Sequence, residues 1–361
     1  MYKYSLNDVE WGEFKVGGNK GVFKVSNSKP YHKANLTIST KGIPYVTRTS
    51  MNNGLEDLIV DANYEKNPKN TISLGAENAD FFFQGVDYVS GNKMYCISNN
   101  KITREVGLFL VQVFRQSIKE CGFGYGKGLT GTRFKNRYVM LPVDENNNPN
   151  WHFMEEYIKE RESKQRNDLK EYYKSRLLDL VICPEELTDV EWGEFFLGNI
   201  FTIDTKPSRG LNHLNRDEKN GVSYVGATNR NNGVLDFVKE DLKRQYKGNC
   251  IAFIRNGEGS MGYSIYKKES FIATQDISVG YNEKLNEYSA KFITTIADRV
   301  RGKYTFGYKR NQTRLKKEIL TLPIDENGDP NWSYMENFIK NIEQKQIKNV
   351  LKYLDEYIYN V

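Results

Sequence analysis

The sequence has few of the residues that build metal sites and disulfide frameworks. It holds only four cysteines and three histidines in 361 residues. The cysteines Cys96, Cys121, Cys183 and Cys250 are scattered and form no Cys-x-x-Cys pair, so neither a zinc site nor a disulfide framework is expected. We predict no metal, and reduced thiols in a cytoplasmic protein are the simplest interpretation.

Long apolar runs are also missing. No stretch approaches the roughly 18 consecutive apolar residues of a membrane-spanning helix. The opening residues MYKYS carry no apolar segment of the kind that starts a secretory signal. We therefore expect a protein that is neither secreted nor embedded in a membrane.

Recognisable catalytic motifs are absent as well. There is no P-loop, and no histidine lies in a nucleophile pattern that the repeat described below preserves. Segments 148–151 and 329–332 lack the second proline of the Asn/Asp-Pro-Pro-aromatic motif of amino-methylating DNA methyltransferases. Tyr125 stands where a Phe-x-Gly-x-Gly loop for S-adenosylmethionine needs glycine. We expect no catalytic residue and no cofactor, although a DNA-modifying enzyme, a methyltransferase or nuclease with an unrecognised site, stays open as the alternative.

What the chain does contain is a long internal repeat. The heptapeptide DVEWGEF at residues 8–14 returns at 189–195, an offset of 181 residues. The step LPVDEN at 141–146 returns as LPIDEN at 322–327, at the same offset. Because both ends of the unit repeat and the interiors match poorly, the sequence predicts two like-framed domains with related sites that read different things.

Composition is compatible with nucleic-acid binding. The formal net charge is +6, and aromatic residues make up 13% of the chain. A basic balance permits contact with phosphates but does not prove it. A two-lobed interaction protein that binds no nucleic acid therefore remains a third interpretation.

Short apolar segments punctuated by Gly, Asn and Ser predict strands and turns in each unit, with opening strands at 21–25 and 199–203 and helices near 104–119 and 287–300. We predict an α+β protein with two pseudo-repeated α/β domains, each followed by a long helix, the two helices packing as an antiparallel coiled-coil-like spacer. The predicted boundaries are domain 1 at 1–150, helix 1 at 151–182, domain 2 at 183–331 and helix 2 at 332–361, with a linker at 181–188.

The closing helices have an apolar seam at 3–4 residue spacing. At 1.5 Å per residue, the first would be roughly 45 Å long, which is long for a helix within one small domain. The seam favours an interhelical and partner-docking face over a helix that lies on its own sheet. The candidate partner-binding residues are Met154, Tyr157, Ile158, Met335, Ile339 and Ile342.

Two matching loops carry side chains that suit base edges. Segments 45–54 and 224–233 each run from Tyr-Val to Asn-Asn-Gly, a sequence that suits a tight turn. Arg and Asn make bidentate contacts with guanine and adenine, respectively. The base-reading candidates are Arg48, Thr49, Asn52, Arg230, Asn231 and Asn232, with a plain hairpin turn as the alternative.

A basic and aromatic segment without acids follows in each unit, at 122–138 and 301–317. Gly-rich segments with cations suit contact with the phosphate backbone, whereas a solvated charged face is the plainer alternative. The candidates in these segments are Lys127, Arg133, Lys135, Lys309, Arg310 and Arg314. Further candidates lie in other basic loops, at 29–33, 206–209 and 255–268, namely Lys33, Arg209 and Arg255.

Together these motifs resemble the specificity (S) subunit of Type I and Type IIB restriction-modification systems. The resemblance rests on the Trp-x-x-Phe opening with LGNIFTI at 197–203, on the GVSYV and GIPYV segments before Asn-Gly, and on the LPxDEN to Asn-Trp-x-x-Met step into each closing helix. It implies two target recognition domains that each read half of a split double-stranded DNA sequence. It also implies helices that act as a ruler and bind methyltransferase subunits, with a restriction subunit as a further partner, and no catalytic residues. The system type stays open.

Overall fold

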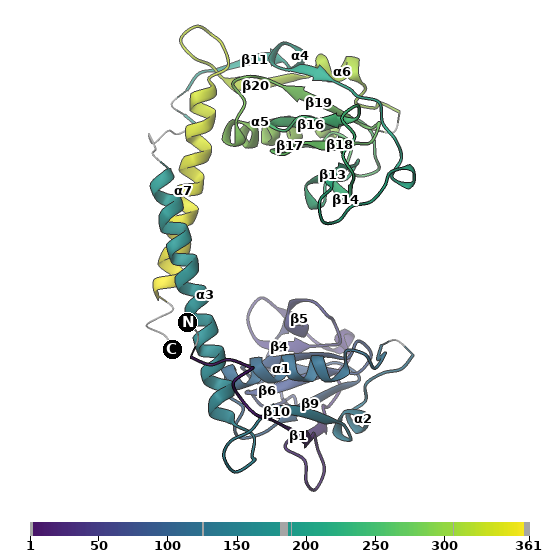
Figure 1. Cartoon of the computed structure of the whole chain (residues 1–361), viewed down its shortest axis with the longest axis vertical. Coiled ribbons are helices and arrows are strands. Elements are labelled where there is room, and N and C mark those ends of the chain that lie inside the picture. The colour runs from purple at the N-terminus through teal and green to yellow at the C-terminus, as the bar shows by residue number, and fades with distance from the viewer. Residues whose placement is uncertain (1–2, 125, 181–186, 189, 306, 357–361) are drawn as a thin grey trace. The chain divides into compact units, whose positions relative to one another are not determined.

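The repeated motifs at the two ends of each unit are hydrogen-bonded partners. In this computed structural model (Figure 1), β1 (Trp11–Lys15) pairs antiparallel with β10 (Tyr138–Pro142), and β11 (Trp192–Phe196) pairs with β20 (Ile319–Pro323). Trp11 lies opposite Pro142, and Trp192 lies opposite Pro323. The repeated sequence motifs therefore form the strand pair that joins the start of each unit to its end.

The structure describes residues 3–124, 126–180, 187–188, 190–305 and 307–356. They fall into two units, Met1–Leu169 and Lys170–Val361. Tyr125, Phe306 and most of the expected linker lie outside the described residues.

The units share the strand order of one four-stranded sheet and of three strands in the other, which confirms the predicted common fold, while the fourth strand of that other sheet lies at opposite edges in the two units. The first has four-stranded sheets in the orders β2-β9-β6-β7 and β3-β5-β4-β8, and the second has β12-β19-β16-β17 and β14-β13-β18-β15. In the first unit the strands are β2 (Lys24–Asn27), β3 (Ile38–Ser39), β4 (Ile43–Val46), β5 (Leu55–Ile59), β6 (Thr71–Gly75), β7 (Asp80–Gln84), β8 (Val89–Ser90) and β9 (Met94–Ser98). In the second they are β12 (Thr202–Asp204), β13 (Val222–Val225), β14 (Val234–Val238), β15 (Gln245–Tyr246), β16 (Cys250–Ile254), β17 (Ser264–Lys267), β18 (Phe271–Ala273) and β19 (Ile277–Tyr281).

One amphipathic helix covers the β6-containing or β16-containing sheet of each unit. These are α1 (Arg104–Ile118) and α5 (Glu287–Arg299), close to the predicted ranges. Thr103 caps α1 with its side chain, and Asn286 forms a capping box with Ser289 at the start of α5. The buried faces of both helices join the main apolar core of their unit.

Two expected strands begin later than the sequence indicated. The strands placed at 21–25 and 199–203 are β2, starting at Lys24, and β12, starting at Thr202. In the second unit the short helix α4 (Leu197–Ile200) occupies the segment before β12, and Phe201 N–H donates to the Leu197 carbonyl at 2.9 Å. The helical turn of α4 therefore takes the place of the first part of the strand that the apolar pattern predicted.

The long helices start where the sequence predicted, α3 (Trp151–Asp179) at Trp151 and α7 (Trp332–Glu356) at Trp332. The side-chain oxygen of the preceding residue, Asn150 or Asn331, accepts from the backbone N–H three residues later at 2.9 Å in each case. These asparagines act as N-caps and fix the start of each helix.

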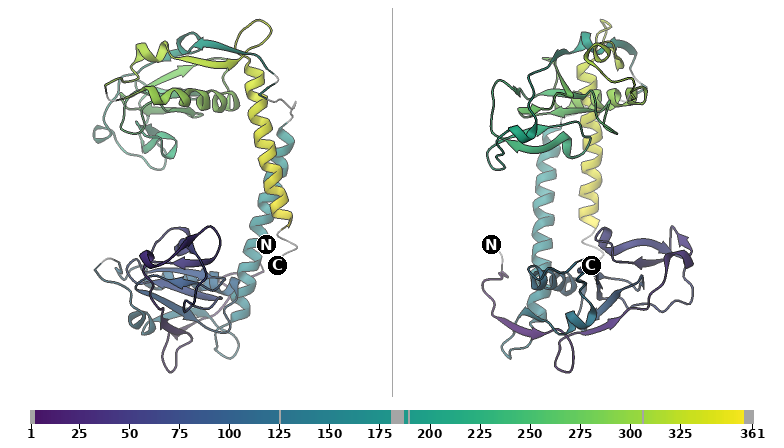
Figure 2. Two further views of the ribbon diagram at one scale, coloured as in Figure 1. Left: turned by 180° about the vertical axis from the view of Figure 1, so that it is seen from behind. Right: turned by 90° about the vertical axis from the view of Figure 1, so that its right-hand side faces the viewer.

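The last part of α3 runs antiparallel to α7 within the second unit (Figure 2). Lys170 pairs with Asp355 at 2.6 Å, and Arg176 pairs with Glu343 at 2.8 Å. The antiparallel arrangement is confirmed, and these ion pairs join the two helices. Tyr172 and Tyr353 are 61% and 62% exposed.

Met154 and Met335 face the interior, which corrects their assignment as partner-binding residues. Both side chains are 0% exposed and belong to the cores of their units. The first turn of each helix lies against its sheet, so the seam residues there attach the helix to the domain.

We expect Met154→Ala and Met335→Ala each to lower the free energy of unfolding of their own unit by about 2–5 kcal/mol, since each opens a cavity in a packed core. Denaturant unfolding followed by tryptophan fluorescence measures this. The control Tyr172→Ala should change stability by less than about 0.5 kcal/mol, because the ring is exposed. Loss of stability in Tyr172→Ala equal to that in Met335→Ala would contradict the assignment.

Candidate nucleic-acid interface

The two expected base-reading loops form the same turn. Asn52 and Asn53 have φ of 51° and 56°, and Asn231 and Asn232 have φ of 49° and 52°. Asparagine tolerates this left-handed conformation because its side chain can bond locally. All four asparagines are exposed. The predicted correspondence of the two loops is therefore present in the backbone.

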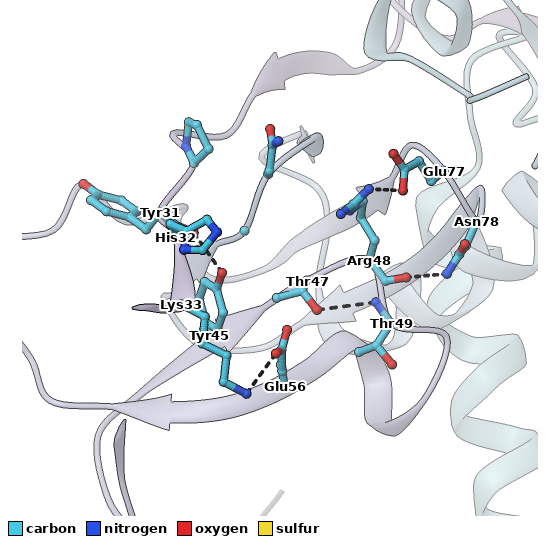
Figure 3. Close-up of a pocket in the computed structure, with 13 residues that line it drawn as sticks. Tyr31, His32, Lys33, Tyr45, Thr47, Arg48, Thr49, Glu56, Glu77 and Asn78 are labelled. Atoms are coloured by element: carbon cyan, nitrogen blue, oxygen red, sulfur yellow. Dashed lines mark hydrogen bonds and ion pairs between the residues drawn. The ribbon is translucent and has the colours of Figure 1, made fainter. Parts of the chain in front are cut away.

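In the first unit, the β6–β7 turn ties this loop to the basic segment (Figure 3). Asn78 Nδ2 donates to the Arg48 carbonyl at 2.5 Å, and Glu77 forms an ion pair with the Arg48 guanidinium. On its other side, the Ala76 carbonyl accepts from Leu129 N–H at 2.7 Å. Three loops, at 47–54, 76–79 and 127–130, therefore form one face.

The second unit repeats this arrangement with different residues. Ser260, in the β16–β17 connection, donates its hydroxyl to the Ala227 carbonyl at 2.7 Å. Ala227 stands two residues after Tyr-Val, as Arg48 does in the first unit. Arg310 then joins the connection to the basic segment by donating to the Gly262 carbonyl at 2.9 Å. The same carbonyl is thus held in both units by a hairpin loop.

Sequence reasoning missed Glu77, Asn78 and Ser260. They lie in the turns between two apolar strands, where the repeat alignment is weakest. The available signal was the turn composition itself, because a polar turn between paired strands has to end at one edge of the sheet.

The face of the first unit contains a polar hollow of about 680 Å³, lined by the residues shown in Figure 3. Lys33 lies there between Asp57 at 2.6 Å and Glu56 at 3.0 Å. Hydrogen bonds to Asp57 and Glu56 raise the pKa of the Lys33 ammonium. Lys33 and Arg48 are therefore both paired with carboxylates. Thr49 uses its hydroxyl oxygen to accept from Met51 N–H at 3.2 Å.

The loop of the second unit also carries an arginine, Arg230, at a different position. Arg230 is exposed, and within the described ranges no carboxylate lies at ion-pair distance from it. Arg209 is also exposed, and its carbonyl accepts from the Tyr224 hydroxyl at 2.9 Å. Arg255 is half-buried and donates to the carbonyl of Gln275. Arg230 is thus the base-reading candidate that the structure leaves most open.

The basic segments contain matching short helices, α2 (Gly131–Lys135) and α6 (Gln312–Lys316). Arg133 donates to the Gly128 carbonyl at 2.6 Å, and Arg314 donates to the Lys309 carbonyl at 2.8 Å. The two donors, Arg133 and Arg314, stand 181 residues apart, and so do the two acceptors, Gly128 and Lys309. The loop geometry is therefore duplicated. The Arg314 guanidinium also lies 3.9 Å from the centre of the Tyr308 ring.

The lysines of the basic segments are at the surface. Lys127, Lys135 and Lys309 are exposed. Lys127 donates to the Cys121 carbonyl at 2.9 Å. The predicted phosphate-contacting residues of both segments are therefore on the surface, with one exception.

The exception is Arg310, which the structure removes from the predicted phosphate contacts. Its side chain is 0% exposed and forms an ion pair with Glu318, also 0% exposed, at 2.5 Å. The Tyr304 hydroxyl donates to the same carboxylate at 2.6 Å, and burial raises the pKa of Tyr304. Arg310 fixes the basic segment from inside. In the first unit, Leu129 and Arg137 stand at the repeat positions of this pair.

We expect Arg310→Leu to lower the free energy of unfolding of the second unit by about 3–5 kcal/mol, because the Glu318 carboxylate would remain buried without a cation. The double variant Arg310→Leu/Glu318→Gln should recover most of that loss. Equilibrium denaturant unfolding measures both, with exposed Lys317→Leu as the control. A double variant no more stable than Arg310→Leu would refute the role of the pair.

A second hollow, apolar this time, lies beside the long helix of each unit. Those of the first and second units enclose about 480 and 580 Å³. Six pairs of lining residues hold the repeat offset of 181, namely Leu6/Leu187, Trp11/Trp192, Tyr138/Ile319, Met140/Thr321, Tyr157/Phe338 and Ile158/Ile339. Ile342 also lines the second hollow and is 43% exposed. Four of the predicted partner-binding residues, Tyr157, Ile158, Ile339 and Ile342, therefore line these hollows.

Comparison with known proteins identifies the family. A model of the Type I restriction modification DNA specificity domain matches residues 9–171 and again residues 189–353. The chain belongs to this family. Each repeat is one copy of the specificity domain, and the chain is a DNA-recognition protein of the restriction-modification type rather than a catalytic one.

A curated relative and a solved structure agree with this assignment. The chain is 27% identical over 313 residues to the Type II restriction enzyme BgcI specificity subunit S.BcgI of Heyndrickxia coagulans, covering 85% of this chain and 87% of that protein. The fold resembles the Type I restriction-modification S subunit from M. genitalium, with a TM-score of 0.58, 16% identity, and coverage of 97% and 94% of the two chains. Among the described residues, no helix is long and apolar enough to cross a membrane.

Proposed function

We propose that the three-loop face of each unit reads one half of a split double-stranded DNA target. On this view residues 1–150 and 183–331 are the target recognition domains, and 151–182 and 332–361 are the spacer helices. The observation that carries the proposal is the duplicated frame, in which one loop carbonyl is held by Asn78 in one unit and Ser260 in the other. A constant frame with different exposed side chains suits two different half-sites.

The two kinds of candidate residue have different tasks. Arg48, Thr49 and Asn52 in one unit, and Arg230, Asn231 and Asn232 in the other, contact base edges, where bidentate Arg and Asn contacts distinguish guanine and adenine. The surface cations of the basic segments, with Lys33, Arg209 and Arg255, hold phosphates and carry no sequence information directly.

The apolar hollows are the docking sites for methyltransferase subunits, and a restriction subunit joins the same assembly. Exposed apolar side chains grouped on a surface mark a site of protein contact. The lining of these hollows is duplicated, whereas the side chains of the DNA face differ between the units. Base extrusion and methyl transfer then belong to the partner. The chain performs this role in the cytoplasm.

The function is tested by purifying the chain with its methyltransferase partner and selecting bound sequences from a random DNA library. Two short conserved blocks at a fixed separation are expected, with steep salt dependence of binding. A single block, or no enrichment, would exclude reading of a split target. Binding of S-adenosylmethionine or methyl transfer by the isolated chain would instead favour the enzyme alternative.

We expect Arg230→Ala to cost roughly 1–3 kcal/mol in binding and to relax the sequence preference of one half-site only, since a bidentate base contact is lost. Competition binding of the assembled complex with cognate and base-changed half-sites measures this. The matched control Lys135→Ala should weaken all sequences alike and lower the salt slope by about one. If Arg230→Ala weakens cognate and base-changed half-sites equally, the loop does not read bases.

Tyr138 and Ile319 occupy the same repeat position, one in each apolar hollow. We expect Tyr138→Lys and Ile319→Lys each to abolish docking of one methyltransferase subunit, because a charged side chain in an apolar hollow is costly to bury. Their side chains are 52% and 42% exposed, so the fold should persist. Sedimentation of the co-purified complex, which measures its mass, should show fewer bound partner subunits for each variant and the fewest for the double variant. Leu242→Lys, at a position 82% exposed and outside both hollows, is the control. Unchanged assembly in the double variant would place docking elsewhere.

A further inference from the structure

The Asn-Asn-Gly turns have a backbone conformation with positive φ that most residues rarely adopt. The glycine after the two left-handed asparagines also has positive φ, 76° at both Gly54 and Gly233. Such conformations persist only when the surrounding structure holds them in place. The side chains that hold these turns therefore decide how well the exposed residues are positioned.

One side chain from the neighbouring sheet reaches the same atom in both units. Gln84 Nε2 donates to the Asn53 carbonyl at 3.2 Å, and Lys267 Nζ donates to the Asn232 carbonyl at 3.3 Å. Gln84 is the last residue of β7, and Lys267 is the last residue of the equivalent strand β17. The geometry is duplicated although the residue type is not.

Both side chains lie under the turn and away from the surface. Gln84 is 6% exposed and Lys267 is 4% exposed. Gln84 donates in addition to Ser73 Oγ at 3.1 Å, whereas Ala252 stands at that strand position in the second unit. No described carboxylate forms an ion pair with Lys267, and burial lowers the pKa of its ammonium. A buried lysine without a carboxylate is uncommon, which calls for a role that offsets its desolvation.

We propose that Gln84 and Lys267 are positioning residues that hold the two turns from below and thereby set the sequence discrimination of each half-site without touching DNA. This inference rests on the proposed function of the turns. It explains why two chemically different residues end equivalent strands, because each supplies an N–H donor at the same place.

The test removes the donor and keeps the length of the side chain. In the complex assembled with the methyltransferase partner, Lys267→Met should lower discrimination between the cognate half-site and a base-changed one about fivefold, the effect of one ordinary hydrogen bond. Gln84→Met should do the same for the other half-site. In each variant the half-site read by the unchanged unit serves as the internal control.

A conservative rescue separates positioning from general packing. Lys267→Gln supplies the donor that the first unit uses, so its discrimination should stay within about twofold of the parent. Unchanged discrimination in Lys267→Met, or an equal loss on all sequences that Lys267→Gln does not rescue, would overturn the inference. If Lys267→Met does not fold, Gln84→Met decides by the same criteria.

Arg230→Ala measured in parallel distinguishes the two possible failures. If Arg230→Ala also leaves discrimination unchanged, the turn does not read DNA and the proposed function fails. If Arg230→Ala relaxes discrimination and neither methionine variant does, the proposed function stands and the positioning inference fails.

Discussion

The antiparallel pairing of the opening and closing strands is the constraint on which each unit depends. Ile324 N–H donates to the Glu191 carbonyl at 2.9 Å, and Val143 N–H donates to the Glu10 carbonyl at the same distance. In both units the asparagine before the long helix donates its backbone N–H to the last proline of the closing strand at 2.8 Å. The helix start is therefore fixed to the strand pair. Many residues between the two strands can diverge without changing these backbone hydrogen bonds.

Divergence within this frame has produced different solutions to the same geometric demands. The basic segment is anchored by Leu129 in an apolar core in one unit and by the buried Arg310–Glu318 pair in the other. A buried ion pair gains little net stability over apolar packing, but removal of one partner is costly. The second unit therefore tolerates fewer single changes beneath its basic segment. A recognition surface can vary most easily where its support is apolar.

The sequence predicted what depends on local pattern, and it failed where burial depends on distant residues. Trp151 and Trp332 begin their helices as expected, and both Asn-Asn-Gly segments are tight turns, because capping and left-handed turns are local. Arg310 looked like its exposed neighbours in the sequence. Its burial depends on Glu318 and on the Gly262 carbonyl from another strand connection, which no local pattern shows. The assignment of Met154 and Met335 as partner-binding residues was wrong for the same reason, because their burial depends on the core residues packed against them.

Charge composition likewise does not translate directly into a basic face. Lys33 and Arg48 carry positive charges in the first unit, but Glu56, Asp57 and Glu77 pair with them. An exposed pair of this kind contributes only about 0–1 kcal/mol, so a phosphate can replace the carboxylate at small cost. A cation already neutralised by the protein adds less to the net release of counterions when it meets DNA. If the proposed function holds, binding by the first unit should therefore depend less steeply on salt, per cation in its face, than binding by the second unit, where no described carboxylate lies at ion-pair distance from Arg230.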